Sequence, residues 1–280
     1  MFPPGLPSPE LMKDHQRFDI SLRFQRLVDS LRELEALADA FSIPELKDTG
    51  RIHLSSVPVA VELKRATGSA VIPTITLRDS NRQGFIGLAS FAIFSGLENL
   101  LLVRGDPYSG AENEPKNVYD FAKISSAVKR LRLLEAHLSG REKTCILAPL
   151  NLTKIGSSAY ISTIRERESA GIDVFVTESL FEDTEKYLDR ILKIRSLGVE
   201  APIIHSIFPF RDYEDAVKCV QKFGWNVSER ELHDLKTKGE RAGVEMARER
   251  YFSLLDRKDV SQGVSISTRG DSELVRQIVS

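Results

Sequence analysis

The stretch Leu101-Leu102-Val103-Arg104-Gly105-Asp106-Pro107 decides the expected fold. Its apolar run stops abruptly at Arg-Gly-Asp-Pro, as a buried parallel strand does when it reaches the edge of a sheet. The glycine has no side chain, so a ligand can approach the backbone closely, and Arg104 and Asp106 place opposite charges at that point. Loops at the carboxyl ends of strands carry the functional residues of α/β enzymes. This turn is therefore the first candidate site.

Segments of strand and helix character alternate along the rest of the chain. The expected strands are 18–22, 38–44, 69–77, 99–103, 144–148, 174–177, 202–207 and 264–267. The expected helices are 23–37, 54–66, 81–95, 118–138, 159–170, 183–196, 212–223, 272–279 and two within 228–256, separated near Gly239 or Gly243.

Eight strand–helix units in a chain of 280 residues predict a (β/α)8 TIM barrel, an α/β fold closed in a single domain over residues 18–280. The proline-rich residues 1–17 are expected to form an irregular N-terminal arm. An open doubly wound sheet is the alternative, but no G-x-G-x-x-G motif follows any expected strand.

Composition excludes several classes of protein. Lys and Arg number 39 against 40 Asp and Glu, so we expect neither nucleic acid nor a membrane surface as a partner. The chain has no signal-peptide pattern and no apolar run of the roughly 20 residues needed to span a bilayer, so we expect a cytoplasmic protein. Cys145 and Cys219 are too few for a disulfide framework or a thiolate metal site, and His205 has no second histidine at ligand spacing. We expect no metal.

The expected strand ends carry a polar set of mixed charge and little histidine, with no Ser–His–Asp arrangement. Its members are Asp19 or Ser21, Thr76 with Arg78 and Asp79, Arg104 with Asp106, Ala148, Glu178 and His205. Such a set suits a planar polar molecule, because a carboxylate accepts from ring N–H groups and an arginine neutralises a phosphate or a developing anion.

Structural readings of the same residues stay open beside the functional ones. Arg104 and Asp106 could form a rim ion pair, and Glu178 could be an exposed loop carboxylate. Arg78, Asp79 and Arg82 could be charges at a helix entry, where Asp79 and Ser80 are good caps. We expect the aromatic side chains of the following helix to lie in the core: Phe85, Phe91 and Phe94.

Four segments together resemble the methylenetetrahydrofolate reductase family, a flavin-dependent family of (β/α)8 barrels. Asn99–Pro107 is similar to the family's strand that ends in Arg-Gly-Asp, and it is the most specific of the four. The others are Ile75–Arg82, Ala170–Phe181 and Ile203–Pro209. The resemblance covers about residues 18–270.

The resemblance implies an oxidoreductase of one-carbon metabolism and methionine biosynthesis. It would reduce methylene-tetrahydrofolate, or a related tetrahydropterin, to the methyl form with hydride from a flavin. FAD is the implied flavin, with FMN or none as alternatives, and NAD(P)H or another external donor would reduce it. The residues implied to bind the flavin are Thr76, Arg104, Gly105, Asp106, Tyr119, Ala148 and Arg167. Asp106 would also act on the pterin, and Glu178 would bind its amino-pyrimidine edge.

The chain departs from the family pattern at several positions. The family's general-acid glutamate has its nearest match in Asp19, the expected proton donor. The flavin-side histidine falls at Thr74, the Glu-x-x-His loop is absent from Pro149–Leu152, and a pterin-contacting glutamine falls at Glu178. These departures leave open a non-redox pterin-binding methyltransferase and a non-catalytic subunit of a one-carbon complex. We expect a homo-oligomer, and a heteromeric electron-transfer partner stays open.

Overall fold

A computed structural model of the protein describes residues 5–6, 20–45, 52–78, 80–105, 120–137, 143–179, 184–223, 225, 227–268 and 270–280. These residues fall into two compact units. Unit 1 comprises Met1–Ala148 and Glu166–Asp173, and unit 2 comprises Pro149–Arg165 and Val174–Ser280.

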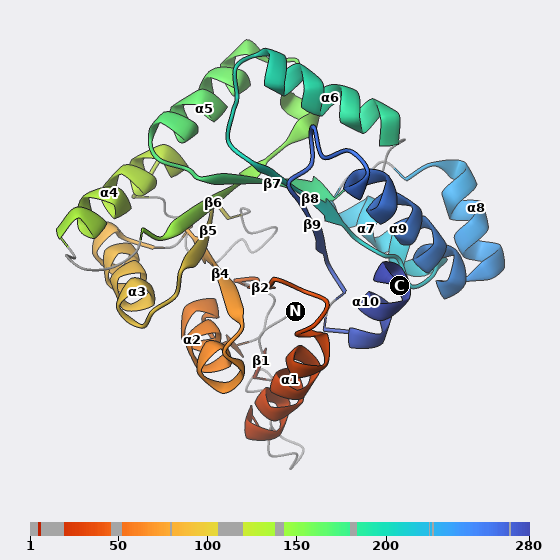
Figure 1. Ribbon diagram of the computed structural model, residues 1–280, viewed down its shortest axis with the longest axis horizontal. Coiled ribbons are helices and arrows are strands. Elements are labelled where there is room, and N and C mark those ends of the chain that lie inside the picture. Colours follow the sequence, from red (N-terminus) through yellow and green to blue (C-terminus); the bar gives the residue numbers. More distant parts are fainter. Residues whose placement is uncertain are drawn as a thin grey trace, which may run out of the picture. The chain divides into compact units, whose positions relative to one another are not determined.

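Unit 1 is built on parallel strands in the order β2 (Ala40–Ile43), β4 (Ala70–Thr76), β5 (Asn99–Val103) and β6 (Cys145–Leu150). The helices that alternate with them are α1 (Ile20–Leu34), α2 (Ser56–Thr67), α3 (Arg82–Phe94) and α4 (Ile124–His137) (Figure 1). A separate two-residue strand β1 (Gly5–Leu6), within the predicted arm, pairs antiparallel with β3 (Ile52–His53).

Side chains alternate between the two faces of this sheet. Ile75 pairs with Leu102, and Leu100 pairs with Ile146, so these four share the face that α2, α3 and α4 cover in Figure 1. Each of them is at most 1% exposed. Burying one such side chain contributes about 2 kcal/mol. The opposite face includes partly exposed side chains, and Thr76 lies on it.

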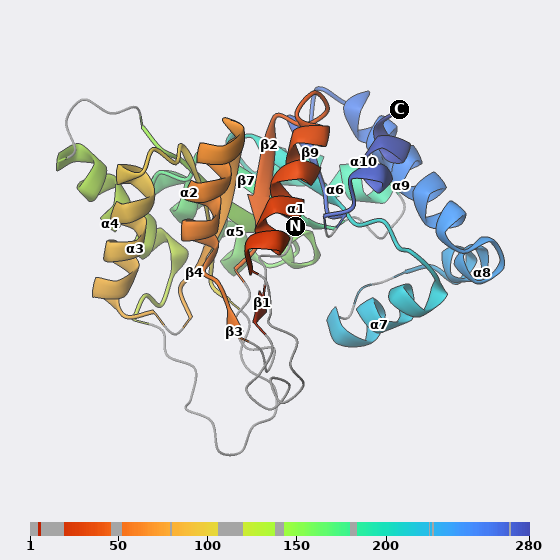
Figure 2. The same cartoon turned by 90° about the horizontal axis from the view of Figure 1, so that it is seen from below.

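Unit 2 contains the parallel strands β7 (Val174–Ser179), β8 (Ile203–Ile207) and β9 (Gly263–Ile266). It also contains the short turn η2 (Leu152–Lys154) and the helices α6 (Thr184–Ser196), α7 (Tyr213–Phe223), α8 (Glu229–Lys238), α9 (Glu240–Leu255) and α10 (Ser272–Val279). Helix α5 (Ser158–Ser169) belongs to unit 2 up to Arg165 and to unit 1 from Glu166. Helices α7, α8 and α9 are neighbours in Figure 2 and enclose a small core of Phe210, Ala216, Cys219, Leu235 and Ala242.

Seven of the eight predicted strands are confirmed, and each of the seven is followed by at least one helix in the chain. The architecture is therefore α/β of the TIM-barrel kind. The predicted first strand, 18–22, is wrong over the part that the structure describes, because helix α1 begins at Ile20. The described residues show no eighth strand beside these seven, so they do not show a closed barrel. The single-domain boundary stays a prediction.

Two helix predictions around α3 also need correction. The helix predicted from Val118 begins only at Ile124. The residues before it make other contacts: Asp120 accepts a hydrogen bond from the Arg82 N–H, and the ring of Phe121 packs edge-on against that of Phe85, with 5.2 Å between the ring centroids. The cap of α3 is Asn81, whose side chain accepts from the Gly84 N–H at 2.7 Å, instead of Asp79 or Ser80.

The aromatic residues of α3 do not share one environment. Phe85 is buried as predicted, but Phe91 is 45% exposed and Phe94 72% exposed, so the core prediction is wrong for these two. The buried positions of α3 are Phe85, Ala89, Ala92 and Ile93, and their spacing defines the core-facing side of the helix.

A cluster of charges lies near the start of β6 in unit 1, and we call it the Arg132 cluster. Its members are Arg132, Glu135, Lys143, Gly171 and Asp173. Arg132 donates to the carbonyl oxygens of Gly171 and Thr144 and pairs with Glu135 and Asp173. Asp173 also pairs with Lys143 and accepts from the Ile146 N–H. Desolvation raises the pKa of Asp173, but the Ile146 N–H, Lys143 and Arg132 together lower it overall.

Candidate functional site

The carboxyl ends of β4 and β5 form one candidate site in unit 1, which we call the β4–β5 rim. The strands stay paired beyond their last residues. The Leu77 N–H donates to the Val103 carbonyl and the Arg78 N–H donates to the Arg104 carbonyl, each at 3.0 Å. This pairing brings four residues of two separate segments side by side: Thr76, Arg78, Arg104 and Gly105.

Gly105 is required at the rim by its own backbone and its neighbours. Its φ is +84°, a conformation that favours glycine. A Cβ at this position would lie 3.0 Å from Arg78 Cβ and 3.5 Å from Thr76 Cβ. Packing within the rim therefore requires the glycine, a reason that differs from the ligand approach argued from the sequence.

Thr76 carries the least satisfied polar group of the rim. Its side chain is 6% exposed, and its Oγ1 is buried with no hydrogen-bond partner within the described residues. Buried hydroxyls nearly always have a partner, so such an atom marks a strained or ligand-binding position. Beside it, Arg78 is buried and Arg104 is exposed.

The other predicted flavin-binding residues lie elsewhere or outside the described chain. Ala148 is two residues beyond Ile146 on β6, so its side chain shares the helix-covered face and Thr76 lies on the opposite face. Arg167 lies in the last turn of α5, where its carbonyl accepts from the Ile172 N–H. Asp19, Asp106 and Tyr119 lie outside the described residues.

The second candidate site is the carboxylate of Glu178, on β7 of unit 2. Asn151, directly after β6, donates from Nδ2 to Glu178 Oε2 at 3.1 Å. Desolvation raises the pKa of Glu178, although the Thr153 N–H, Lys154, Arg190 and the Leu152 N–H each lower it. Sequence reasoning assigned no role to Asn151. The available signal was an asparagine between a strand and a short turn, which is a capping position.

His205, also predicted at a strand end, belongs to a closed network inside unit 2. It is fully buried, and its Nε2 faces the Val260 carbonyl at 3.3 Å. A carbonyl only accepts, so Nδ1 accepts from the Tyr187 hydroxyl at 2.7 Å. That hydroxyl lies 2.8 Å from Thr177 Oγ1. Burial lowers the pKa of His205 to about 4. The hydrogen bond with the Val260 carbonyl raises this pKa, but by less than burial lowers it. His205 is therefore a buried member of the core of unit 2.

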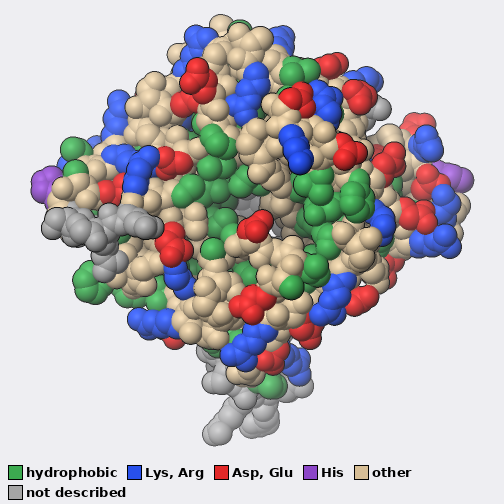
Figure 3. Space-filling model, viewed as in Figure 1, with side chains coloured by type: hydrophobic (Ala, Val, Ile, Leu, Met, Phe, Trp, Pro, Cys, Tyr) green, Lys and Arg blue, Asp and Glu red, His purple; other side chains and the backbone are tan. Residues whose placement is uncertain are grey.

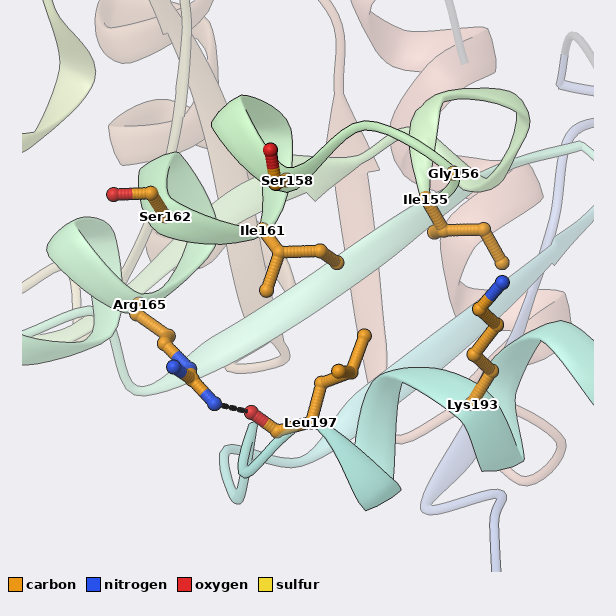
Figure 4. Close-up of a pocket in the computed structure, with 8 residues that line it drawn as sticks. All are labelled: Ile155, Gly156, Ser158, Ile161, Ser162, Arg165, Lys193 and Leu197. Atoms are coloured by element: carbon orange, nitrogen blue, oxygen red, sulfur yellow. Dashed lines mark hydrogen bonds between the residues drawn. The ribbon is translucent and has the colours of Figure 1, made fainter.

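A groove on the outer helices of unit 2 is a separate feature (Figure 4). Its volume is about 440 Å³, and it is lined by Ile155, Gly156, Ser158, Ile161, Ser162, Arg165, Lys193 and Leu197. Arg165 donates to the Leu197 carbonyl, and Lys193 lies at the other end beside Ile155. None of the predicted site residues lines it.

Neither the charge on the face shown in Figure 3 nor metal ligands among the described residues add a further site. Lys, Arg, Asp and Glu side chains are interspersed over α5 and α6, without a patch of one sign on the face shown in Figure 3. The described ranges contain no group of three or more His, Cys, Asp or Glu that could hold a metal ion. No helix found in them is long and apolar enough to cross a membrane.

Parallel strands that alternate with helices, with polar residues at their carboxyl ends, define an α/β protein of the class that binds small ligands at those ends. Comparison with known families then identifies which one. The methylenetetrahydrofolate reductase family model matches residues 21–279, so the chain belongs to this family.

Plant relatives agree with the family over part of the chain. A probable NADH-type methylenetetrahydrofolate reductase of Oryza sativa subsp. japonica is 25% identical over 128 residues, which is 43% of this chain and 21% of the relative. An NADH-type enzyme of Arabidopsis thaliana is 26% identical over 133 residues, 43% of this chain and 22% of that protein. The matched part thus spans about a fifth of these relatives.

Solved structures support the fold. A protein from Clostridium thermocellum, described as binding two copies of 5-methyl-5,6,7,8-tetrahydrofolic acid, aligns with a TM-score of 0.64 at 14% identity and covers 99% of this chain and 92% of its own. A GH18 chitinase from Pseudoalteromonas aurantia aligns with a TM-score of 0.51 at 12% identity, over 90% of this chain and 94% of its own. At these identities the likeness shows the fold alone.

Proposed function

We propose that this protein binds a reduced folate, or a related tetrahydropterin, and reduces its methylene form to the methyl form with hydride from a flavin. The observation that carries the proposal is the buried Thr76 hydroxyl, without a partner within the described residues, beside the Arg104–Gly105 turn. Family membership and the folate bound by the Clostridium thermocellum protein support it. FAD is the proposed flavin and NADH or NADPH its reductant.

The residues of the β4–β5 rim fit a flavin in two respects. The Thr76 hydroxyl needs a polar partner, which the edge of a flavin ring offers. Arg104 is an exposed cation at the same strand ends, where it would stabilise negative charge. A bound flavin supplies hydride transfer. In the proposal Gly105, Asp106 and Tyr119 complete this set, Ala148 contributes through its backbone, and Arg167 contributes a cation.

The remaining residues act on the pterin. The Glu178 carboxylate has lone pairs for the two N–H donors of an amino-pyrimidine edge, although Asn151 already uses one position. Asp106 would orient the pterin, and Asp19 would deliver the proton that the reduction requires. We place this reaction in the supply of methyl groups for methionine synthesis, in the cytoplasm, by a homo-oligomer.

The test begins with the spectrum of the purified protein. Bound flavin absorbs near ~450 nm and bleaches when NADH or NADPH reduces it. Re-oxidation by methylene-tetrahydrofolate with formation of the methyl product would support the proposal. A colourless protein that binds 5-methyltetrahydrofolate would favour the methyltransferase alternative. A protein that binds neither flavin nor folate would overturn the proposal and favour a non-catalytic subunit.

A further inference from the structure

The contacts of Asn151 are unusually specific for a residue with no assigned role. Its side-chain Oδ1 accepts from the Thr153 N–H at 3.0 Å and from the Thr153 hydroxyl at 2.6 Å. Both acceptor positions of Oδ1 are thereby used. The amide therefore has one orientation, in which Nδ2 must face Glu178.

The backbone of Asn151 is held as firmly as its side chain. Its N–H donates to the Tyr160 hydroxyl at 2.6 Å, which ties the end of β6 to helix α5. The residue also caps η2, with an extended backbone at φ −96° and ψ 107°. The donor that reaches Glu178 is thus preorganised by a strand end, a turn and a helix.

Glu178 is approached by two backbone donors and two charges besides Asn151. Its side chain is exposed, so without a fixed donor the carboxylate would sample several rotamers. The groups that act on it are the Leu152 and Thr153 amides, and the charges of Lys154 and Arg190. The two amides belong to the turn that Asn151 caps, and the charges act over a distance. Asn151 adds the side-chain donor, and its hydrogen bond is made to Oε2 at 3.1 Å.

We propose that Asn151 is a positioning residue: it holds Glu178 Oε2 so that the rest of the carboxylate is presented to the N–H donors of a reduced folate. This inference rests on the proposed function and deepens it. An ionised carboxylate accepts hydrogen bonds at both oxygens, so holding one leaves acceptor positions for the ligand. A neutral donor is needed, since an anion at position 151 would repel Glu178.

The experiment compares two asparagine-to-aspartate variants. Asn81→Asp is the matched control, because Asn81 also caps a helix through its side-chain oxygen, and among the described residues no hydrogen bond links it to a carboxylate. The dissociation constant of 5-methyltetrahydrofolate is measured from pH 4 to 8 for wild type and both variants. In Asn151→Asp the new carboxyl can donate to Glu178 only while it is protonated.

We expect the affinity of Asn151→Asp to approach that of Asn81→Asp at pH 4, near the ordinary aspartate pKa of about 3.9, and to fall about five- to tenfold below it by pH 8. A purely structural role would weaken binding equally at every pH. Asn151→Ala removes the donor and should weaken binding about three- to tenfold at all pH values, with a melting curve as the folding check.

The outcomes separate the inference from the function on which it rests. If wild type binds 5-methyltetrahydrofolate but the ratio of the two aspartate variants stays constant with pH, the positioning role is wrong and the proposed function stands. If wild type does not bind the folate, the proposed function is overturned and the inference falls with it. An Asn151→Ala protein that folds and binds like wild type would also overturn the positioning role.

Discussion

The Arg132 cluster and the β4–β5 rim are both polar regions of unit 1, but they differ in how their groups are satisfied. In the cluster, one guanidinium has two carbonyl and two carboxylate partners near the start of β6. At the rim, the Thr76 hydroxyl is buried and no partner for it occurs in the described ranges. The difference separates polar groups that are satisfied within the fold from one that is not, and we propose that the unsatisfied hydroxyl binds a ligand.

The two regions also sit at opposite ends of the strands. Asp173 contacts Ile146, the second residue of β6, while Thr76 is the last residue of β4. In α/β barrels the carboxyl ends hold the chemistry and the amino ends contribute stability. We therefore expect substitutions in the cluster to change stability alone, and substitutions at the rim to change ligand binding.

The largest effect is expected from Arg132→Met. It removes the cation that Asp173 and Glu135 share and one donor side chain from each of two carbonyls, so the free energy of unfolding should fall by about 3 kcal/mol. Arg130→Met, at an exposed position of the same helix, should change it by less than ~0.5 kcal/mol. Urea unfolding measures both. An equal effect of the two variants would mean that the cluster is no more stabilising than a surface charge.

The His205 network of unit 2 tests whether a second closed network also stabilises the fold. The pKa of His205 is about 4 in the folded protein and 6.5 in its ordinary state. The unfolded chain therefore binds the proton first, and this contribution to stability is complete above pH 6.5 and lost as the pH falls towards 4. The loss should approach about 3 kcal/mol at pH 4.

His205→Gln keeps a donor and an acceptor but does not titrate in this range. We expect its unfolding free energy to be lower at pH 7 and to change less than that of wild type between pH 6.5 and 4. The lowered pKa of Asp173 acts in a different window, below the ordinary carboxyl value of 3.8, where stability is again lost on acidification. Parallel curves for the two proteins would show that His205 does not carry the acid sensitivity.

Seven strands could be predicted because a parallel strand buried under helices is a short apolar run, and 99–103 and 202–207 are of this kind. The stretch at 18–22 looks equally strand-like. Its described part, 20–22, nevertheless belongs to helix α1, because Leu27, Leu31 and Leu34 form a buried helical face that the partly buried Phe24 begins. At the boundary of a segment, the local pattern of apolar residues does not decide between a strand and a helix.

The candidate sites were predictable only as strand ends. The sequence places Thr76 and Glu178 after apolar runs, which was enough to select them. It does not tell that the Thr76 hydroxyl is buried or that Asn151 reaches Glu178 across 27 positions, because strand register and turn geometry set these contacts. Ala148 and Thr76 lie on opposite faces of the sheet, because side chains alternate between the two faces along each strand. This can be seen only once the register of the strands is known.

Two glycines allow a matched comparison of the cluster and the rim. Gly171 has φ +108° and a Cβ there would lie 2.9 Å from Arg132 Nε, while Gly105 has φ +84° and a Cβ there would lie 3.0 Å from Arg78 Cβ. Alanine at either position should lower stability by about 1 to 2 kcal/mol. Gly87→Ala, with open space around its Cβ, should instead be stabilising by up to ~1 kcal/mol.

Ligand binding should separate the two destabilised glycine variants. Gly105→Ala should also weaken retention of the flavin, and Gly171→Ala should retain it as wild type does. Thermal unfolding and absorbance after gel filtration give the two readouts. Equal flavin retention in both variants would place the ligand away from the rim.

The smallest change in stability is expected from Thr76→Val, and its sign distinguishes the rim from a closed network. Valine keeps the shape of threonine and removes a buried hydroxyl that has no partner in the described part of the chain, so stability should stay constant or rise by up to ~1 kcal/mol. Thr177→Val is the control in unit 2, because that hydroxyl contacts Tyr187 and accepts from the Ser206 N–H. It should lower stability by about 1 to 2 kcal/mol.

The flavin content of the two valine variants completes the comparison. Thr76→Val should lose flavin while remaining as stable as wild type, because the hydroxyl then acts only when a ligand is present. Thr177→Val should keep its flavin while becoming less stable. If Thr76→Val is instead destabilised as much as Thr177→Val, the Thr76 hydroxyl already has a partner within the folded chain. The rim would then be a closed network like the Arg132 cluster, and the distinction between the two regions would disappear.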